Sequence, residues 1–264
     1  MGVLELSGYI AAFMMGATLG TIGGGGSILT VPILVYLMGV APVTATGYSL
    51  LIVGSAAAFG AFRYYHKGLV DIKASIIFAL PSIATVYLAR AWLMPALPDP
   101  LLTVPFEIGK DIAIMVLFAL LMIVAAGMML RNSMKAVVPR DTPHHPGLVM
   151  IEGAVVGLFT GILGAGGGFL IIPALVLLMG MPMAQAVGAS LFIIALKSLI
   201  GFVGDIQTGI ALQMPMLAIF FFATFAGMYS ATFLSHKINE TALKRGFAVF
   251  TLAVAAIILG KELL

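Results

Sequence analysis

The chain has 264 residues, of which 62% are hydrophobic and only 9% charged, and its mean hydropathy is +1.18. So low a fraction of charged residues is not typical of a soluble protein. Continuous apolar runs such as Ile112 to Leu130 are typical of helices that cross a lipid bilayer. The alternating segments of a membrane β-barrel, each about 10 residues long, are not seen. The net charge of +3 comes without a basic stripe, so nucleic-acid binding is not indicated, and the absence of cysteine excludes disulfides and thiolate metal sites.

In chain order, apolar runs and breakers predict ten helical segments in two sets of five. The first set covers residues 4–22, 27–38, 43–62, 72–94 and 108–130, and the second covers residues 148–163, 168–179, 183–203, 212–235 and 246–260. We therefore expect a first transmembrane repeat at residues 1–130, a cytoplasmic linker at 131–147 and a second transmembrane repeat at 148–264. The linker is the longest polar stretch and contains three prolines.

The second segment of each set is too short to span the membrane as a straight helix. Each holds 12 residues, which corresponds to about 18 Å of helix against a hydrocarbon core of about 30 Å. A glycine cluster precedes each one, and an early proline follows at Pro32 or Pro173. We expect unwound backbone at the clusters, with its polar groups satisfied by neighbouring protein.

The two halves are copies of one another. Gly20 to Gly39 reads GTIGGGGSILTVPILVYLMG, and Gly161 to Gly180, 141 positions later, reads GILGAGGGFLIIPALVLLMG. Without gaps, this offset gives 19 identities in 53 positions from Gly16 to Gly68. Glycines kept in register over this length indicate an internal duplication rather than a shared helix composition.

Loop charge predicts that the two repeats have opposite orientations in the membrane. Cytoplasmic loops collect Lys and Arg, and three basic loops are expected inside: Arg63 with Lys67 and Lys73; Arg131 with Lys135 and Arg140; Lys237 with Lys244 and Arg245. The loops expected outside lie around Pro95 to Lys110 and Asp205 to Gly209. The 141-residue offset pairs the basic loop at Arg63 to Lys67 with the cation-free loop at Gly204 to Thr208, so equivalent loops face opposite sides. The expected fold class is an all-α polytopic membrane protein of two inverted repeats, whose short helices meet near the midplane.

These residues carry a family resemblance. The stretches GTIGGGGSILTVPIL with GYSLLIVGSAAAFGAFRYYHKGLVD, and GILGAGGGFLIIPAL with GASLFIIALKSLIGFVGD, resemble the doubled signature of the TauE/SafE sulfite exporter family, which includes permeases similar to those for 4-toluene sulfonate uptake. The resemblance covers essentially the whole chain. It implies a multi-pass protein of a bacterial inner membrane or an archaeal membrane that transports sulfite, thiosulfate, sulfonates or related anions, usually outward.

The glycine breaks also favour an anion on physical grounds. Helices that begin after Gly26 and Gly168 would point free N–H groups and the positive end of the helix dipole at the break. Glycine permits a close approach of bare backbone donors to a ligand. The alternative is that small residues here only permit close helix packing. The candidate substrate-binding residues are Gly23, Gly24, Gly25, Gly26, Ser27, Thr46, Ser49, Gly164, Gly166, Gly167, Gly168 and Ser190, and Thr30 is a further possible hydroxyl donor.

Lys197 is the most conspicuous ionisable residue, because it follows six apolar residues and no loop is near. A central lysine costs about 2.5–3.5 kcal/mol on insertion scales, so we expect it to face a cavity or a partner and to attract the anion. The alternative is that it snorkels to an interface or pairs with a structural acid. The matched position in the first repeat is Ala56. Arg63 and Arg90 are candidates for a gate or rim, with an interfacial anchor as the competing role of each.

Transport by alternating access, driven by the anion gradient and the membrane potential, is the predicted mechanism, because no proton relay of buried His and carboxylates is visible. The alternative is a carrier of another small organic anion such as a carboxylate, with or without proton coupling. No HExxH, GxSxG or paired-Asp motif occurs, so an enzyme is not expected. The expected partners are the anion and the lipid bilayer, without cofactor or metal, in a monomer or homodimer.

Overall fold

A computed structural model describes residues 2–100, 109–132, 146–164, 166–177, 179–234 and 240–263. Every regular element in these ranges is helical. The first half contains α1 (Val3–Ile22), η1 (Gly24–Leu29), α2 (Thr30–Pro32), η2 (Ile33–Leu37), α3 (Pro42–His66), α4 (Ile72–Leu88), η3 (Ala89–Leu93), α5 (Met94–Ala96) and α6 (Lys110–Asn132). The second half contains α7 (Pro146–Leu163), α8 (Gly168–Leu177), α9 (Met183–Gln207), α10 (Met214–Leu234) and α11 (Glu240–Leu263).

The expected all-α membrane fold is confirmed. Within the described residues, five helices are long and apolar enough to cross a membrane, and the stretches 26–37 and 147–163 are shorter apolar helices. Two of the five long helices form the centre of the bundle. In α3 and α9, 72% of the span residues are buried, against 33–39% in the other three. Each of these two central helices follows the short helical stretch that comes after a glycine break.

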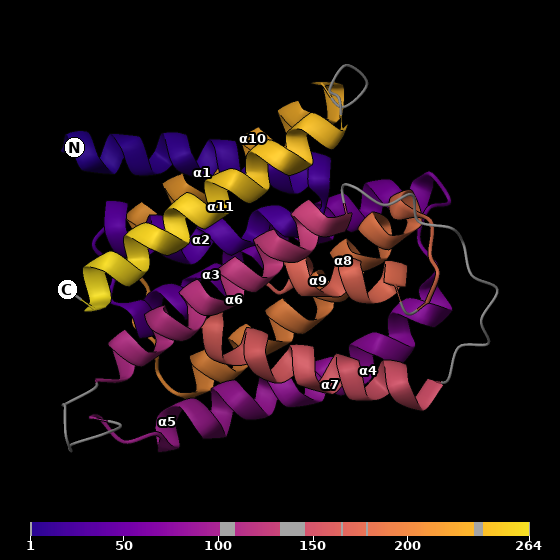
Figure 1. The fold of residues 1–264 in the computed structure, drawn as a ribbon. Helices are drawn as coiled ribbons and strands as arrows, with labels where there is room; N and C mark the ends of the chain where they lie inside the picture. The colour runs from indigo at the N-terminus through magenta and orange to yellow at the C-terminus, as the bar shows by residue number, and fades with distance from the viewer. Residues whose placement is uncertain are drawn as a thin grey trace.

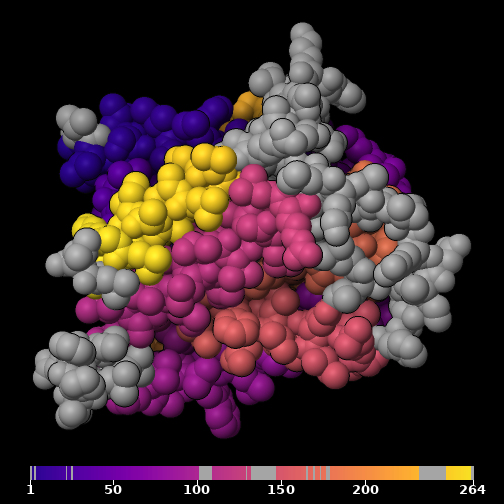
Figure 2. Space-filling model, viewed as in Figure 1, coloured from indigo at the N-terminus to yellow at the C-terminus, as the bar shows by residue number. Residues whose placement is uncertain are grey.

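Helix packing follows the sequence duplication. The offset of 141 matches α1 with α7, α3 with α9, α4 with α10 and α6 with α11. In the structure α1 packs on α10, and α7 packs on α4. Because α7 corresponds to α1 and α4 to α10, the second pair consists of the equivalent helices from the opposite halves. In the other two pairs, α3 with α9 and α6 with α11, each helix packs on its own counterpart from the other half. Figure 2 shows α6 and α11 side by side on one face of the molecule.

Individual glycine contacts repeat this exchange. A side chain at Gly47 of α3 would meet Ile210 and Asp205, and one at Gly188 of α9 would meet Leu69 and Tyr64. The offset pairs the members of these two sets one to one. The two halves therefore contact each other through equivalent positions, as expected of a duplicated chain with a pseudo-two-fold axis.

The two halves also begin at opposite ends of the bundle. Figure 1 shows the start of α1 and both chain termini at one end, whereas α6 ends and α7 begins at the other. This arrangement fits two repeats of opposite direction, but membrane orientation rests on loop charge, so the inverted topology stays a prediction. The expected linker at 131–147 and the domain boundaries beside it fall largely on residues 133–145, outside the described residues.

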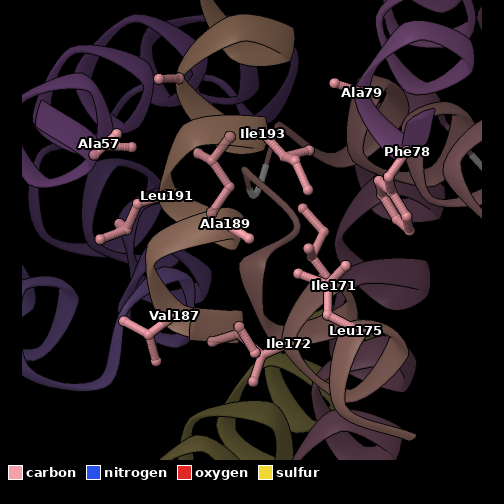
Figure 3. Packing of buried hydrophobic residues seen from close by; sticks show 14 of the residues in the cluster. Ala57, Phe78, Ala79, Ile171, Ile172, Leu175, Val187, Ala189, Leu191 and Ile193 are labelled. Atoms are coloured by element: carbon pink, nitrogen blue, oxygen red, sulfur yellow. The ribbon is translucent and has the colours of Figure 1, made fainter. Parts of the chain in front are cut away.

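An apolar cluster holds the short helix of the second half in place. Figure 3 shows Ile171 and Leu175 of α8 close to Ile193 of α9 and Phe78 of α4, all of them buried. Burial of one such side chain contributes about 1.5–3 kcal/mol in soluble proteins, where water is the reference. This cluster fixes α8, and hence the glycines that precede it, against the central helix α9.

Candidate functional site

The two glycine breaks meet in the middle of the chain's fold. Gly24, at the start of η1, lies directly against the backbone of Gly168, at the start of α8. Gly166 lies against Ser27, whose Cβ and Oγ would each be 3.2 Å from a side chain built at this glycine. The helix starts of the two halves are thus in contact, and the first amides of a helix have no acceptor within it. Two positive helix ends converge here.

The breaks differ in conformation, which corrects part of the sequence prediction. In the first break only Gly23 has a positive φ, of 76°, and Gly24 to Leu29 form the 3₁₀-helix η1, which is followed without interruption by α2 and the π-helical turn η2. The expected unwound backbone before residue 27 is therefore wrong for Gly24 to Gly26. In the second break Gly164, Gly166 and Gly167 all have positive φ, between 63° and 71°, so over the described residues of the two breaks the longer unwound stretch is in the second.

Lys197 lies at the unwound break. Its side chain is 0% exposed, and its ammonium donates a 2.7 Å hydrogen bond to Oγ1 of Thr160 on α7. A side chain at Gly167 would lie 2.6 Å from Nζ of Lys197 and would also collide with Thr160. A residue larger than glycine cannot occupy position 167 without moving the lysine. The prediction that Lys197 faces a polar partner rather than snorkelling to an interface is consistent with this placement.

The lysine has no ion-pair partner in the part of the chain that the structure describes. The salt bridge found there joins Arg90 to Asp205, and no carboxylate lies within 4.0 Å of Nζ of Lys197. Only one of its three possible hydrogen bonds, the one to Thr160, is formed with the described residues. A buried cation beside two positive helix ends is a site that favours an anion.

The predicted hydroxyl ligands are buried, but three of them are engaged locally. Ser27 donates to the Gly24 carbonyl at 2.6 Å, Ser190 to the Val187 carbonyl at 2.8 Å, and Thr46 to the Val43 carbonyl at 2.6 Å. Bonds of this kind to the preceding turn satisfy the hydroxyl proton and leave the oxygen lone pairs.

Two of these hydroxyl positions touch a glycine break. The Thr46 backbone lies against Gly164, and Ser27 lies against Gly166. Thr30 is also buried and donates to the Ser27 carbonyl at 3.0 Å. Ser49 differs from the others, because its buried Oγ has no partner among the described residues. No contact of Ser190 with the breaks is seen among the described contacts, although Val187, one turn earlier, lies against Gly23.

Arg90 is not the exposed interfacial anchor that its position near the end of a span predicts. It is 1% exposed, and its Nη1 donates to Thr46 Oγ1 at 3.0 Å and lies 3.4 Å from Oδ1 of Asp205. Asp205 was expected in an outside loop, but α9 continues to Gln207 and the aspartate is 6% exposed. Opposite charges near the ends of two apolar spans were the available signal for this pair.

Arg63, the other gate candidate, lies elsewhere. It is half-buried near the end of α3, and its Nη1 is buried without a partner among the described residues. Thr46, which contacts Arg90, is 17 residues earlier on the same helix, or about 26 Å along its axis. The structure therefore separates the two arginines, and only Arg90 lies beside the glycine breaks.

Thr160 is the polar site residue that the sequence reasoning missed. It is the acceptor for Lys197, and it lies one turn before the unwound glycines, within the run GLFTGILG. A single hydroxyl in the apolar run from Gly153 to Leu163 was the signal, but threonines often bond to their own helix, and Thr160 also donates to the Gly157 carbonyl at 3.2 Å. Only the fold shows that Thr160 and Lys197, 37 residues apart, come together.

Comparison with known proteins agrees with this architecture. The sequence profile of the family described as "Sulfite exporter TauE/SafE" matches residues 9–258. A protein of Xylella fastidiosa strain Temecula1, called a probable membrane transporter protein, is 34% identical over 196 residues, which is 71% of this chain and 68% of that protein. The probable membrane transporter protein YunE of Bacillus subtilis is 26% identical over 280 residues, 97% of each chain. No solved structure matches. Polytopic helical architecture and these similarities together place the chain in the TauE/SafE sulfite exporter family of multi-pass membrane transport proteins.

Proposed function

We propose that the protein exports sulfite or a related sulfur oxyanion, such as thiosulfate or a sulfonate, by alternating access. The observation that carries this proposal is the buried Lys197, which lies against Gly167 where the two glycine breaks meet and has no carboxylate partner among the described residues. The family name supports the same substrate class.

The physical argument is one of charge balance. A lysine at the centre of a membrane costs about 2.5–3.5 kcal/mol on insertion scales unless it has a partner. An anion between Lys197 and the start of α8 would offset this cost, since both the ammonium and the helix dipole favour negative charge. Unwound glycines let backbone N–H groups approach the oxygens of the anion, which is the arrangement that broken helices use for anionic groups in other transporters.

The membrane potential supplies a driving force for export. Moving one negative charge out of a cell with an inside-negative potential of 100 mV releases about 2.3 kcal/mol, and a dianion releases about twice as much. Movement of one repeat against the other around the contact of Gly24 with Gly168 would open the site to one side of the membrane at a time, because this contact lies between the two repeats. No coupled cation is required by this scheme, and no enzymatic step is part of it.

One observation favours a second candidate, a proton-coupled carrier of a small carboxylate or other organic anion. The sequence placed Asp205 in a loop, which left no buried carboxylate to carry a proton. The structure buries Asp205 in α9 beside Arg90. A buried aspartate near the substrate path is a residue type that proton-coupled transporters use.

Flux measurements separate the two candidates. Purified protein is reconstituted in proteoliposomes, and the vesicles are loaded with unlabelled sulfite. Uptake of radiolabelled sulfite is then followed at fixed membrane potential, with and without a proton gradient. We expect counterflow both with and without the proton gradient, and competition by thiosulfate and sulfonates but not by acetate. In a separate efflux measurement, we expect an inside-negative potential to make sulfite export faster. Flux that vanishes without a proton gradient at fixed voltage would contradict uncoupled export and favour the second candidate.

A further inference from the structure

We propose that Arg90 forms a second anion position, which the transported anion occupies in exchange for the carboxylate of Asp205. Arg90, Asp205 and Thr46 are called the exchange site below. This inference rests on the proposed function, because the anion that reaches Arg90 is the one that passes Lys197. The ligand is a small oxyanion with at least two oxygens, for which a guanidinium offers two parallel N–H donors.

The guanidinium of Arg90 is buried but makes few bonds. Its Nη1 contacts Thr46 Oγ1 at 3.0 Å and Asp205 Oδ1 at 3.4 Å, whereas Nε and Nη2 have no partner among the described residues. Oδ2 of Asp205 is unpartnered there as well. Buried arginine–carboxylate pairs offset their loss of hydration when they are short, at about 2.7–2.9 Å, and often bidentate. This pair is long and single, so the remaining donors fit an exchangeable ligand better than a completed structural pair.

Glycines on two helices make room for these side chains. A side chain at Gly204 of α9 would lie 3.0 Å from Cβ of Arg90, and one at Gly47 of α3 would lie 3.0 Å from Oδ2 of Asp205. Arg90 itself belongs to η3, a π-helical turn in the span that begins with α4. Such turns are frequent at functional sites. The charged pair is therefore enclosed by α3, α9 and η3, and it does not face lipid.

The exchange site adjoins the lysine site through the unwound glycines. Gly164 lies against Thr46, and Gly167 lies against Lys197; three residues of chain span at most about 11 Å. On α9 the lysine and Asp205 are eight residues apart, which is about 12 Å along the axis and about 80° around it. Because the loop after α9 is predicted outside, an exported anion would meet the lysine first and the exchange site second.

In the proposed exchange, the oxyanion takes the donors of Arg90 while Asp205 moves away, and Asp205 returns when the anion leaves. Carboxylate and substrate therefore compete for one guanidinium. This competition prevents a permanently occupied outer site and aids release. No bond is made or broken beyond hydrogen bonds and the ion pair.

Equilibrium binding of radiolabelled sulfite to purified protein in detergent tests the exchange. Asp205→Asn removes the competitor and is expected to tighten sulfite binding about tenfold while slowing counterflow, and Arg90→Gln is expected to weaken binding about tenfold. Tyr48→Phe is the matched control. The hydroxyl of this neighbouring α3 side chain donates to the Ala211 carbonyl and accepts from the Gln213 amide, and among the described residues it has no hydrogen bond to Arg90 or Asp205. We expect wild-type binding from it.

A single variant of a buried ion pair can fail to fold, because it leaves one buried charge without its partner. The double variant Arg90→Gln/Asp205→Asn keeps a neutral hydrogen-bonding pair, so it tests the inference even if a single variant does not fold. We expect it to bind sulfite as weakly as Arg90→Gln. Wild-type affinity in the double variant, or no tightening in a folded Asp205→Asn protein, would overturn the inference. Lys197→Gln separates the two proposals. Loss of binding in this variant, with unchanged binding in all exchange-site variants, removes the exchange site alone, whereas absence of sulfite binding to the wild type removes the proposed function.

Discussion

The two glycine breaks descend from one sequence, yet they have become different structures. The first, from Gly23 to Ser27, has a single positive-φ glycine, continues from Gly24 as the 3₁₀-helix η1, and packs against Val187 and Gly168. The second, from Gly164 to Gly168, is unwound and lies against Lys197. The comparison teaches that two copies of one break can diverge in conformation and in contacts. Under the proposed function, only the second break binds the ligand. The asymmetry makes the two sides of the molecule inequivalent, whereas in the proposed function the direction of net flux is set by the anion gradient and the membrane potential.

The largest expected effect comes from moving the charge between the halves. Lys197→Ala is expected to lower sulfite counterflow at least 100-fold, or about 2.8 kcal/mol at 1.4 kcal/mol per factor of ten, because it removes the only cation in contact with the second break among the described residues. Adding Ala56→Lys, at the matched position of the first half, should not restore flux. Recovery of flux in the double variant would show that the breaks are equivalent and would refute the comparison.

The conformation of the second break gives the next largest effect. Gly167→Ala places a Cβ at a φ of 71°, against Thr160 and the lysine ammonium. Left-handed backbone costs about 1–2 kcal/mol for a non-glycine residue, and the collision adds to it. We expect counterflow to fall about 30-fold and the melting temperature to drop.

Gly68→Ala is the control for backbone strain alone, since Gly68 has a φ of 67° and nothing lies within 4 Å of its built Cβ. This variant should lose some stability and keep near-normal flux. Equal losses of flux in the two variants would mean that strain, rather than contact with the lysine, explains the effect of Gly167→Ala.

Removal of the acceptor for Lys197 should have an intermediate effect. Thr160→Val keeps the shape of the side chain but leaves a buried donor unpaired, at a cost of about 1–3 kcal/mol, so we expect flux to fall about tenfold. Thr160→Ser should restore most of it. Thr224→Val is the matched control, because this buried hydroxyl of α10 has no partner among the described residues. Wild-type transport by Thr160→Val would exclude a role of this hydrogen bond.

The smallest effect is expected from the hydroxyls. Ser27→Ala and Ser190→Ala remove bonds that are made within their own helices, so counterflow should change no more than about threefold, from a net contribution of about 0.5 kcal/mol. A tenfold loss on Ser27→Ala but not Ser190→Ala would bring the first break into the ligand site.

Most of the fold was predictable from the sequence. The described helices follow the ten expected segments, because apolar length, glycine and proline determine where membrane helices begin and end. The different conformations of the two breaks were not predictable, since Gly26 and Gly167 are matched in sequence and differ in φ only through their surroundings. Pairings over long separations, such as Lys197 with Thr160 and Arg90 with Asp205, also required the fold. The importance of Lys197 was predictable, because a charged side chain in an apolar span is costly unless it faces a cavity or a polar partner.

The central claim is that the second break binds a sulfur oxyanion through Lys197. Counterflow of radiolabelled sulfite in proteoliposomes tests it most directly, with thiosulfate, sulfonate and acetate as competitors, for the wild type and for Lys197→Gln, which keeps a hydrogen-bonding side chain of similar length without the charge. We predict robust wild-type flux, competition by the sulfur anions alone, and loss of flux in a variant that still melts cooperatively. Wild-type flux in folded Lys197→Gln protein, or competition by acetate as strong as that by thiosulfate, would contradict the claim.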